Sequence, residues 1–457
     1  MKKIYSILFL AFLISSCNVL DQMSPNDVAE NNVFTSKAGA ESALIGLYNS
    51  MQSRDYYGGF YPMIADLYSD VGVNGGFDNV AMDEINLLEV TPSNLIVENT
   101  WLSVYYTIAV ANAIIENIPK IKDVNFTQSE KDHIKGQALA IRGLAHFDLL
   151  RMFGEHWNQS SAFGIPVVTS VQKVNDIVKR SNVSDTYKAI IKDLVDASAL
   201  ISVDDRSQAF INPIAVQALL ARVYLYKNDK ANAITAATNV IDDGAFTMLD
   251  VNSFESIYSG RFSVESLFEL SFNVQNRSSF NSLTYSRGDA LRTEVFFLLE
   301  SGMDQFFIDR PGDKRAVLVD FVNNDASISP DGRSQKYRGE DNRDNPAYIV
   351  RMAEVYLIRA EANGLTQAGI DDLNMVRTNR GLPAVDIADF ATNADFLNII
   401  LDERKAELNF EGHRMFDLAR TGKINAVLGI DDFRSIFPVP FRETIATKGA
   451  IVQNPQY

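Results

Sequence analysis

Residues 212–244 read NPIAVQALLARVYLYKNDKANAITAATNVIDDG, and this stretch determines the fold class that we predict. Pro213 suits the first position of a helix, and Gly244 suits the position after a last turn. Between them, apolar residues recur at intervals of three and four, which indicates one helix over 214–226 and another over 231–241. Alanines on both segments allow close packing. The stretch therefore predicts a pair of helices joined by a short turn.

The same kind of pattern recurs through much of the chain. A second pair is predicted at 348–363 and 370–379, and both pairs resemble tetratricopeptide helix pairs. Further helices are predicted at 36–51, 97–118, 134–153, 184–200, 395–410 and 414–420. Two short strands are indicated, at 246–249 and 267–272. The chain is therefore predicted to be mainly α.

The composition is that of a folded, acidic protein. Hydrophobic residues make up 46% of the 457 residues, and 42 lysines and arginines face 58 acidic residues, a formal net charge of −16. A chain this acidic is repelled by a phosphate backbone, so we expect no nucleic-acid partner. The single cysteine excludes an intrachain disulfide and a cysteine-based zinc cluster. We expect no resident cofactor.

The N-terminal residues have the features of a lipoprotein signal. Lys2 and Lys3 precede an apolar run at 4–14 that is too short for a bilayer span, which needs about 20 residues. Ile14-Ser15-Ser16-Cys17 then resembles the bacterial lipoprotein box, in which the cysteine is acylated; an ordinary secretory signal is the alternative. We expect cleavage before Cys17, anchoring in outer-membrane lipid by its acyl chains, and a mature charge of −18 after loss of the two lysines.

Four further stretches, in order along nearly the whole chain, carry a resemblance to a known family. They are VFTSKAGAESALIGLYNSM (33–51), YTIAVANAIIENIP (106–119) with GQALAIRGLAHFDLLRMFG (136–154), RMAEVYLIRAEAN (351–363) with DLNMVRTNRGLP (372–383), and ERKAELNFEGHRMFDLARTGK (403–423) closed by FPVPFRETIATKGAIVQNPQY (437–457). Together with the lipoprotein box, they resemble the SusD/RagB family of outer-membrane lipoproteins of Bacteroidetes.

The resemblance implies a fold, a place and a role. The fold is a superhelix of tetratricopeptide-like helix pairs that supports an irregular, loop-rich ligand-binding region with a few short strands. The role is capture of oligosaccharide at the outer face of the outer membrane, without enzymatic activity, and delivery to a SusC-like TonB-dependent transporter. The expected organisation is a signal peptide (1–16), a lipidated tether (17–35) and one SusD-like domain (36–457). Within that domain we expect helical scaffold at about 36–54, 94–245 and 345–425, and irregular segments at about 55–93 and 250–344.

Three alternatives stay open beside this reading. The first keeps the fold and binds peptides or another nutrient, and the second is a scaffold that only contacts proteins. The third is a surface glycoside hydrolase, for which Glu403 and Glu407 offer a carboxylate pair. We favour an ion-pair network for these glutamates with the nearby Arg404, Arg414 and Arg420, because the sequence gives no hint of a cleft around this segment and the resemblance implies a structural role for it.

Aromatic and polar residues predict where the ligand binds. Six aromatic residues lie within 56–77, namely Tyr56, Tyr57, Phe60, Tyr61, Tyr68 and Phe77. A pyranose packs on a ring, and its hydroxyl groups need polar partners, so the predicted site residues are Tyr56, Tyr57, Asp70, Asn74 and Phe77. A second face is predicted from Tyr285, Arg287 and Asp289. We expect alanine at one or more of Tyr56, Tyr57 and Phe77 to weaken binding about tenfold, or 1.4 kcal/mol, without unfolding the protein.

Two tryptophans and an acidic loop complete the candidates. Trp101 lies on the apolar face of its predicted helix and is expected in the core. Trp157 follows the helix stop at Gly154, so it serves either as a ligand platform or as packing. The segments 320–331 and 341–344 carry carboxylates and amides that suit calcium, but their spacing does not match an EF-hand, and a solvated loop is the favoured reading.

Overall fold

A computed structural model describes residues 33–74, 79–173, 176–280, 297–299, 302–320, 333–334, 336–337 and 344–457. Helices dominate it, which confirms the mainly α prediction. The principal helices are α3 (Lys37–Met51), α4 (Phe60–Leu67), α5 (Val80–Asn86), α6 (Leu95–Asn117), α7 (Gln128–Phe153), α8 (Val183–Leu200), α9 (Pro213–Tyr226), α10 (Lys230–Asp243), α13 (Met352–Asn363), α14 (Gln367–Asn379), α15 (Asn393–Leu408), α16 (Arg414–Arg420), α17 (Ile424–Leu428) and α18 (Phe441–Ala446). Short helices α11 (Ser256–Ser259) and α12 (Gly302–Ile308), with 3-10 turns such as η5 (Asp432–Ser435), complete the helical elements.

The helix pair predicted from 212–244 is present as α9 and α10. The side chain of Asn212 accepts a hydrogen bond from the backbone N–H of Ala215 at 2.9 Å, and Pro213 occupies the first helical position. Gly244 ends α10 with a φ of +74°, in the left-handed region that glycine adopts without strain. The local sequence signals therefore suffice to fix both ends of this pair.

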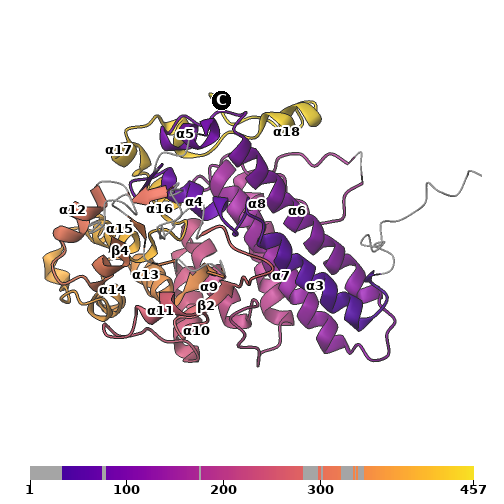
Figure 1. Cartoon of the computed structure of the whole chain (residues 1–457), viewed down its shortest axis with the longest axis horizontal. Helices are drawn as coiled ribbons and strands as arrows, with labels where there is room; N and C mark the ends of the chain where they lie inside the picture. The colour runs from indigo at the N-terminus through magenta and orange to yellow at the C-terminus, as the bar shows by residue number, and fades with distance from the viewer. Residues whose placement is uncertain are drawn as a thin grey trace, which may run out of the picture.

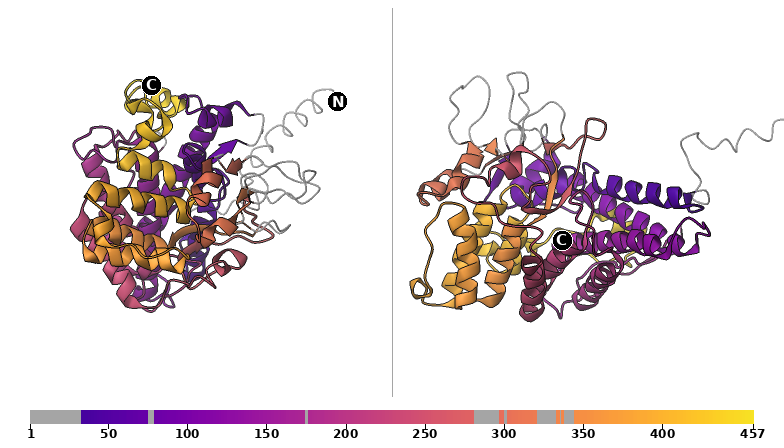
Figure 2. Two further views of the ribbon diagram at one scale, coloured as in Figure 1. Left: turned by 90° about the vertical axis from the view of Figure 1, so that its left-hand side faces the viewer. Right: turned by 90° about the horizontal axis from the view of Figure 1, so that it is seen from below.

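The helices pack in chain order into a curved array. α3, α6, α7 and α8 lie side by side at one end of the molecule, and α13, α14 and α15 form the other end (Figure 1). α9 and α10 connect the two ends, because α9 packs against α8 and α10 packs against α13. The two further views in Figure 2 show the indigo and purple helices at one end and the orange helices at the other. The yellow C-terminal segment does not extend this order, because α16 packs back against α4. None of the helices in the described ranges has the length and apolar character of a membrane span.

One predicted helix start and one predicted strand are wrong. The helix predicted from 348 begins at Met352, because residues Ala347–Arg351 form strand β6, paired antiparallel with β2 (Ser266–Leu270). All five residues of β6 are buried, and a short buried strand cannot be distinguished from a buried helix by its apolar pattern. No strand forms at 246–249, although Phe246 is buried.

The segment 55–93, predicted to be irregular, contains regular structure in its described part. It holds α4, α5 and strand β1 (Gly72–Asn74), which pairs antiparallel with β3 (Phe297–Leu299). All eight residues of α4 are buried. The glycines and polar residues of the segment obscured two helices that are only seven or eight residues long.

A cluster of buried charges links the C-terminal helices to the rest of the protein. We call it the central ion cluster; its described members are Glu265, Asp313, Glu403, Glu407, Glu411, Arg310, Arg315, Lys336, Arg351, Arg377 and Arg380. Burial alone would raise the pKa of Glu403 and of Glu407, but the neighbouring arginines lower both. Glu403 and Glu407 are thus ionised members of an ion-pair network, as favoured from the sequence.

Three buried histidines predict an acid-sensitive stability. Burial lowers the pKa of His146 and of His156 to about 3, and that of His413 well below its usual value of 6.5. Below pH 6.5 the unfolded chain takes up protons that the folded protein does not, so these histidines reduce stability as the pH falls. Glu265 and Glu269 act in the opposite direction, since burial raises the pKa of each.

The contribution of His146 to the pH dependence of stability can be measured by comparing the wild type with a variant that lacks this histidine. We expect the free energy of unfolding of a His146→Gln variant to depend less steeply on pH than that of the wild type between pH 6.5 and 4.5. The expected difference in slope is about 1.4 kcal/mol per pH unit, the value for one proton. Urea titrations monitored by circular dichroism at several pH values measure it, and identical slopes would contradict the assignment of His146 as a buried neutral group.

Candidate functional site

The predicted aromatic segment lies inside the protein. Tyr56 is fully buried and Tyr57 is 6% exposed. Their hydroxyl groups donate to Oδ2 of the buried Asp148 at 2.6 and 2.8 Å, and that of Tyr61 donates to Oδ1 at 2.7 Å. Arg151 forms an ion pair with the same carboxylate. Tyr56 and Tyr57 are therefore framework residues in this structure, and neither ring presents a surface to a ligand.

The electrostatics of this tyrosine group agree with a structural role. Burial, reinforced by the charge of Asp148, raises the pKa of Tyr56 and of Tyr57 well above the usual value of 10. Both hydroxyl groups therefore remain protonated and continue to donate to the carboxylate. An alanine at either position removes buried volume as well as a donor, so we now expect such a variant to lose stability, contrary to the expectation from sequence.

Asp70 and Asn74 are also occupied by other residues of the chain. Arg414 contacts both carboxylate oxygens of Asp70, at 2.6 and 2.9 Å, and Lys405 lies 2.9 Å away. Burial would raise the pKa of Asp70, but these partners lower it to about 2. The side-chain amide of Asn74 donates to the carboxylate of Asp83, and its backbone N–H donates to Oδ1 of Asn86. Cys17, Phe77, Tyr285, Arg287 and Asp289 lie outside the described residues, as does most of the acidic segment 320–331.

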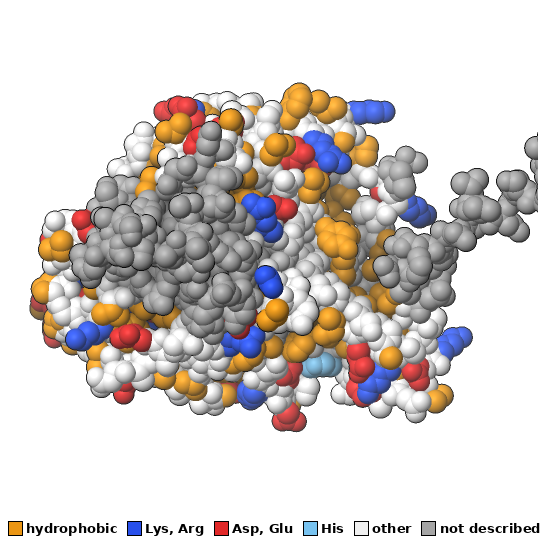
Figure 3. Space-filling view, in the orientation of Figure 1, with side chains coloured by type: hydrophobic (Ala, Val, Ile, Leu, Met, Phe, Trp, Pro, Cys, Tyr) orange, Lys and Arg blue, Asp and Glu red, His pale blue; other side chains and the backbone are white. Residues whose placement is uncertain are grey.

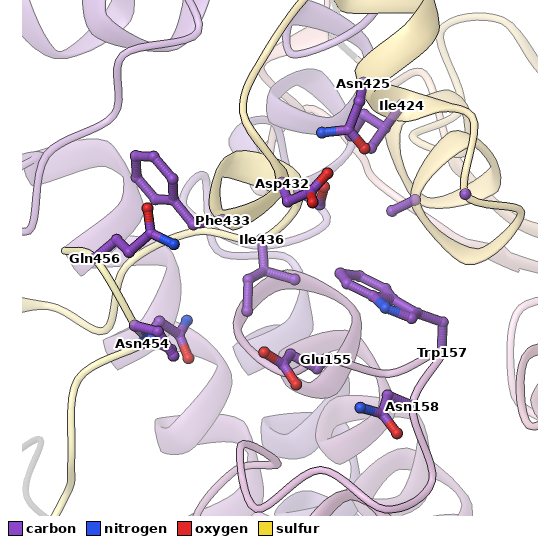
Figure 4. Close-up of a pocket in the computed structure, with 14 residues that line it drawn as sticks. Glu155, Trp157, Asn158, Ile424, Asn425, Asp432, Phe433, Ile436, Asn454 and Gln456 are labelled. Carbon is purple, nitrogen blue, oxygen red and sulfur yellow. The ribbon is translucent and has the colours of Figure 1, made fainter.

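A pocket beside Trp157 brings aromatic and polar side chains together around an open space, unlike the buried tyrosines of the predicted segment. The Trp157 pocket has a volume of about 480 Å³ and lies between the end of α7, the end of α16, α17, η5 and the C-terminal residues (Figure 4). Its lining residues are Glu155, Trp157, Asn158, Ala419, Gly422, Ile424, Asn425, Asp432, Phe433, Ser435, Ile436, Asn454, Pro455 and Gln456. Ligand pockets in proteins typically have volumes of about 300–1,000 Å³, so this one is large enough for a small ligand.

The loop that carries Trp157 is held firmly. Gly154 ends α7, and a Cβ there would lie 2.7 Å from Cδ1 of Leu150 and 3.1 Å from the carbonyl oxygen of Phe163. This close approach lets the N–H of Glu155 donate to the Phe163 carbonyl at 3.0 Å. The hydroxyl group of Tyr187 donates to the carbonyl oxygen of His156 at 2.9 Å. The loop therefore presents Trp157 with little conformational freedom to lose on binding.

The indole of Trp157 points into the pocket. Its ring packs edge-to-face on the imidazole of His156, with centroids 4.9 Å apart, and the residue is 38% exposed. In Figure 4 the indole projects into the space between Glu155, Asp432 and Ile436. Trp101, in contrast, is 2% exposed and belongs to the core, as predicted. Trp157 is therefore exposed, whereas Trp101 is packed in the core.

The opposite wall comes from residues near the C-terminus. The ring of Phe433 packs on Tyr457 with centroids 5.0 Å apart, and the Tyr457 hydroxyl group donates to the Ile436 carbonyl at 2.9 Å. The side-chain amide of Asn454 donates to the carbonyl oxygens of Phe153 and Phe437, at 3.0 and 2.7 Å. These bonds fix the C-terminal tail against the end of α7, so both walls of the pocket are built in advance of binding.

The lining combines apolar rings with carboxylates and amides. Trp157 and Phe433 offer apolar surface, and Glu155 and Asp432 offer hydrogen-bond acceptors. Burying roughly 100 Å² of apolar ligand surface against a ring contributes about 2–3 kcal/mol to the binding free energy, at about 25 cal/mol/Å². A ligand with both apolar faces and hydroxyl groups therefore suits the pocket.

A second pocket lies on the other side of Trp157. We call it the α15 pocket; it has a volume of about 380 Å³ and is lined by Trp157, Leu225, Tyr226, Asn228, Lys230, Glu361, Gly364, Asn393, Ala394, Phe396, Leu397, Ile400, Arg420 and Thr421. The two pockets also share the turn after α16, because Gly422 lines the first and Thr421 lines the second. Trp157 is thus a common wall of two adjacent hollows.

Comparisons with known proteins agree with this architecture. A family model described as starch-binding associating with outer membrane matches residues 18–225, and a SusD family model matches residues 321–433. The chain is 24% identical to SusD-like protein P2 of Formosa agariphila over the full length of both.

Solved structures share the fold. A SusD superfamily protein from Bacteroides thetaiotaomicron superimposes with a TM-score of 0.81 at 26% identity, covering 91% of this chain and 99% of that one. A laminarin-binding SusD-like protein superimposes with a TM-score of 0.77 at 23% identity, covering 93% of this chain and 100% of that one, which shows a shared fold. The family models, the full-length relative and the shared fold lead to one conclusion: the chain belongs to the SusD/RagB family.

Proposed function

We propose that this protein binds glycans at the bacterial surface and passes them to a SusC-like TonB-dependent transporter, without cleaving them. The observation that carries the proposal is the exposed Trp157, set among carboxylates and amides in a preformed pocket of a chain from this family. The match to a starch-binding family model and the shared fold with a laminarin-binding SusD-like protein support glycan as the ligand class. Figure 3 shows basic side chains dispersed among acidic ones on the described part of one face, which does not suit nucleic acid.

The absence of turnover rests on the chemistry of the pocket. A glycoside hydrolase needs two carboxyl groups, one of which is kept protonated by an apolar environment. The Trp157 pocket does contain two carboxylates, but Glu155 is only half-buried and Asp432 is exposed, so neither is enclosed in an apolar environment of that kind. We propose that Glu155 and Asp432 accept hydrogen bonds from sugar hydroxyl groups and transfer no proton to the glycosidic oxygen.

Replacing Trp157 by alanine is expected to abolish most of the binding. Loss of a stacking surface worth about 2 kcal/mol or more corresponds to a decrease in affinity of roughly thirtyfold. Calorimetry with maltoheptaose, laminariheptaose and other oligosaccharides of defined length measures it, and chromatography of the same mixtures detects any product. Tyr106→Ala is the matched control, since Tyr106 is 65% exposed and lines neither pocket.

Three outcomes would contradict parts of this proposal. Binding by the Trp157→Ala variant at wild-type affinity would place the glycan site elsewhere. A defined product released by the wild type and absent with Glu155→Gln would identify a hydrolase. Saturable binding of peptides, with no binding of any glycan, would favour the alternative nutrient class.

The membrane anchor is tested at Cys17. We propose that acylation of this residue holds the protein on the outer leaflet, close to a transporter, so that the two associate at high effective concentration. A Cys17→Ala variant is expected to incorporate no palmitate and to be lost from the outer-membrane fraction. Undiminished palmitate labelling of that variant would refute the anchor, and a native pull-down that never recovers a SusC-like barrel would refute the partner.

A further inference from the structure

We propose that the Trp157 site takes an uncharged oligosaccharide chain that lies across both pockets, and that it rejects glycans carrying carboxylate or sulfate groups. The inference rests on the proposed function and specifies the class of glycan. It follows from how the two pockets adjoin and from the charges that surround the first of them.

The two pockets can be occupied by one chain because they share their walls. Trp157 lines both, and of the consecutive residues at and after the end of α16, Ala419 and Gly422 line the first pocket while Arg420 and Thr421 line the second. The volumes, about 480 and 380 Å³, are each within the range of a ligand pocket. A linear glycan can therefore place sugar units on both sides of the indole, whereas a monosaccharide can use only one side.

The first pocket carries negative charge without a compensating cation in its lining. Glu155 and Asp432 are its charged lining residues, and no lysine or arginine is among the described residues that line it. No hydrogen bond or ion pair of either carboxylate side chain is found within the described part of the chain, so both are free to accept from hydroxyl groups. A carboxylate or sulfate of a ligand would meet two like charges there.

The nearest basic side chains are engaged elsewhere. The guanidinium of Arg180 interacts electrostatically with Glu155. Its hydrogen bonds, however, go to the carbonyl oxygens of Gly164, Phe153 and Val452 and to the side chain of Asn454. Arg420 forms ion pairs with Glu361 and Asp417. Arg434 donates to the carbonyl oxygen of Leu88. None of the three can donate a hydrogen bond to an acidic sugar in the Trp157 pocket without breaking these bonds, and the charge of Arg420 is already balanced by two carboxylates. Arg180 and Arg434 donate to neutral groups and keep their charge, so they weaken the repulsion of an acidic ligand without binding it.

The amide groups of the pocket suit hydroxyl groups. Oδ1 of Asn158 accepts from the hydroxyl group of Ser160 at 2.9 Å, which directs its NH₂ group away from that partner and leaves it as a donor. The NH₂ group of Asn425 donates to the carbonyl oxygen of Ile430 at 2.9 Å, which leaves its oxygen as an acceptor. A neutral sugar hydroxyl both donates and accepts, so it satisfies both groups. A ligand carboxylate only accepts.

The α15 pocket differs in one respect that shapes the experiment. Lys230, exposed at the start of α10, lines this pocket and can meet a single acidic group at one end of a chain. A probe with one terminal charge would therefore give an ambiguous result. The test needs a glycan in which every unit is charged, so that some charge must enter the Trp157 pocket.

The experiment compares neutral and acidic oligosaccharides of equal length by calorimetry. The neutral probes are maltoheptaose and laminariheptaose, and the acidic probe is the galacturonic acid heptamer, with each mono- and trisaccharide as a length series. We expect at least one neutral heptamer to bind at least tenfold more tightly than the acidic heptamer and its own monosaccharide. The double variant Glu155→Gln/Asp432→Asn should bring the acidic heptamer to within threefold of the neutral one.

A second variant tests the span across the two pockets. Ala394 is exposed on α15 and lines the α15 pocket, so Ala394→Trp should fill that pocket and remove the gain in affinity from the longer chain. Ala391→Trp, exposed just before α15 and outside both linings, is the matched control. A length series unchanged by Ala394→Trp would overturn the two-pocket arrangement.

The outcomes separate this inference from the proposed function. If the acidic heptamer binds as tightly as the neutral ones, and Trp157→Ala abolishes that binding, the charge selection is wrong while glycan binding stands. If no glycan binds, neutral or acidic, the proposed function itself fails. If Trp157→Ala leaves neutral binding intact, the site assignment fails. Circular dichroism of each variant confirms that it is folded before its affinity is compared.

Discussion

Replacing Glu407 by glutamine is expected to be among the most destabilising single changes in the protein. Its carboxylate accepts a hydrogen bond from Nη1 of Arg351 at 2.9 Å, and two from Nε and Nη2 of Arg380 at 2.9 and 3.0 Å. Arg315 lies 3.3 Å away. Glutamine has nearly the same shape but no charge, so the variant would leave three buried guanidinium groups with less neutralising charge. Breaking a buried ion pair in this way typically costs about 3–5 kcal/mol.

The measurement and its control use the same substitution. Urea unfolding of Glu407→Gln, monitored by circular dichroism, is compared with that of Glu41→Gln. Glu41 lies on the exposed side of α3, 57% exposed and 4.0 Å from Lys37, so its replacement should leave the midpoint nearly unchanged. A Glu407→Gln variant as stable as the wild type would mean that the central ion cluster tolerates an uncompensated charge.

Replacing Asp148 by asparagine is expected to have the second largest effect. One carboxylate accepts the hydroxyl groups of Tyr56, Tyr57 and Tyr61, and it also pairs with Arg151. All of these groups are buried. Asparagine brings an NH₂ group toward donors and removes the charge that balances the arginine. We expect a loss of about 3–5 kcal/mol of the free energy of unfolding.

Two companion variants separate the charge from the packing. Asp132→Asn, near the start of the same helix in an exposed hydrogen bond with Gln128, should have little effect. Tyr57→Phe removes one donor and should cost about 0.5–1.5 kcal/mol, whereas Tyr57→Ala also leaves a cavity and should cost about 3–5 kcal/mol. Equal stability of Tyr57→Ala and wild type would return Tyr57 to the list of surface candidates.

The helical scaffold was predictable because its signals are local. Asn212, Pro213 and Gly244 mark the ends of α9 and α10 within a few residues of the helices themselves. Ser36 likewise caps α3, accepting a hydrogen bond from the N–H of Gly39. Strand β6 was not predictable in this way, because it exists only by pairing with β2, some 80 residues earlier in the chain.

The candidate site was less predictable for the same physical reason. Trp157 was recognisable as a candidate, since a tryptophan after a helix-ending glycine falls in a loop. Its partners Asn425 and Asp432 gave no signal, because the pocket forms only when the loop after α7 meets residues that are more than 260 positions later. Glu155 lies in the same loop as Trp157, but a single glutamate in a loop predicts no site by itself. Conversely, the aromatic enrichment at 56–77 was real, but three of its tyrosines are used to bind Asp148 in the interior.

The wide spacing of the central ion cluster along the chain has a consequence for the order of folding. Arg380 pairs with Glu265 across 115 positions, and Arg351 pairs with Glu407 across 56. Helices α6, α7 and α8, by contrast, pack against their neighbours in sequence. Contacts between distant residues form slowly, because a long loop must close before any of them is gained. A chain that is synthesised from its N-terminus is therefore expected to assemble helices α6, α7 and α8 first. The arginines of the central ion cluster are expected to stay hydrated until the chain has been made as far as Glu411. That interval, rather than the folded state, is when the protein is most exposed to proteases and to aggregation.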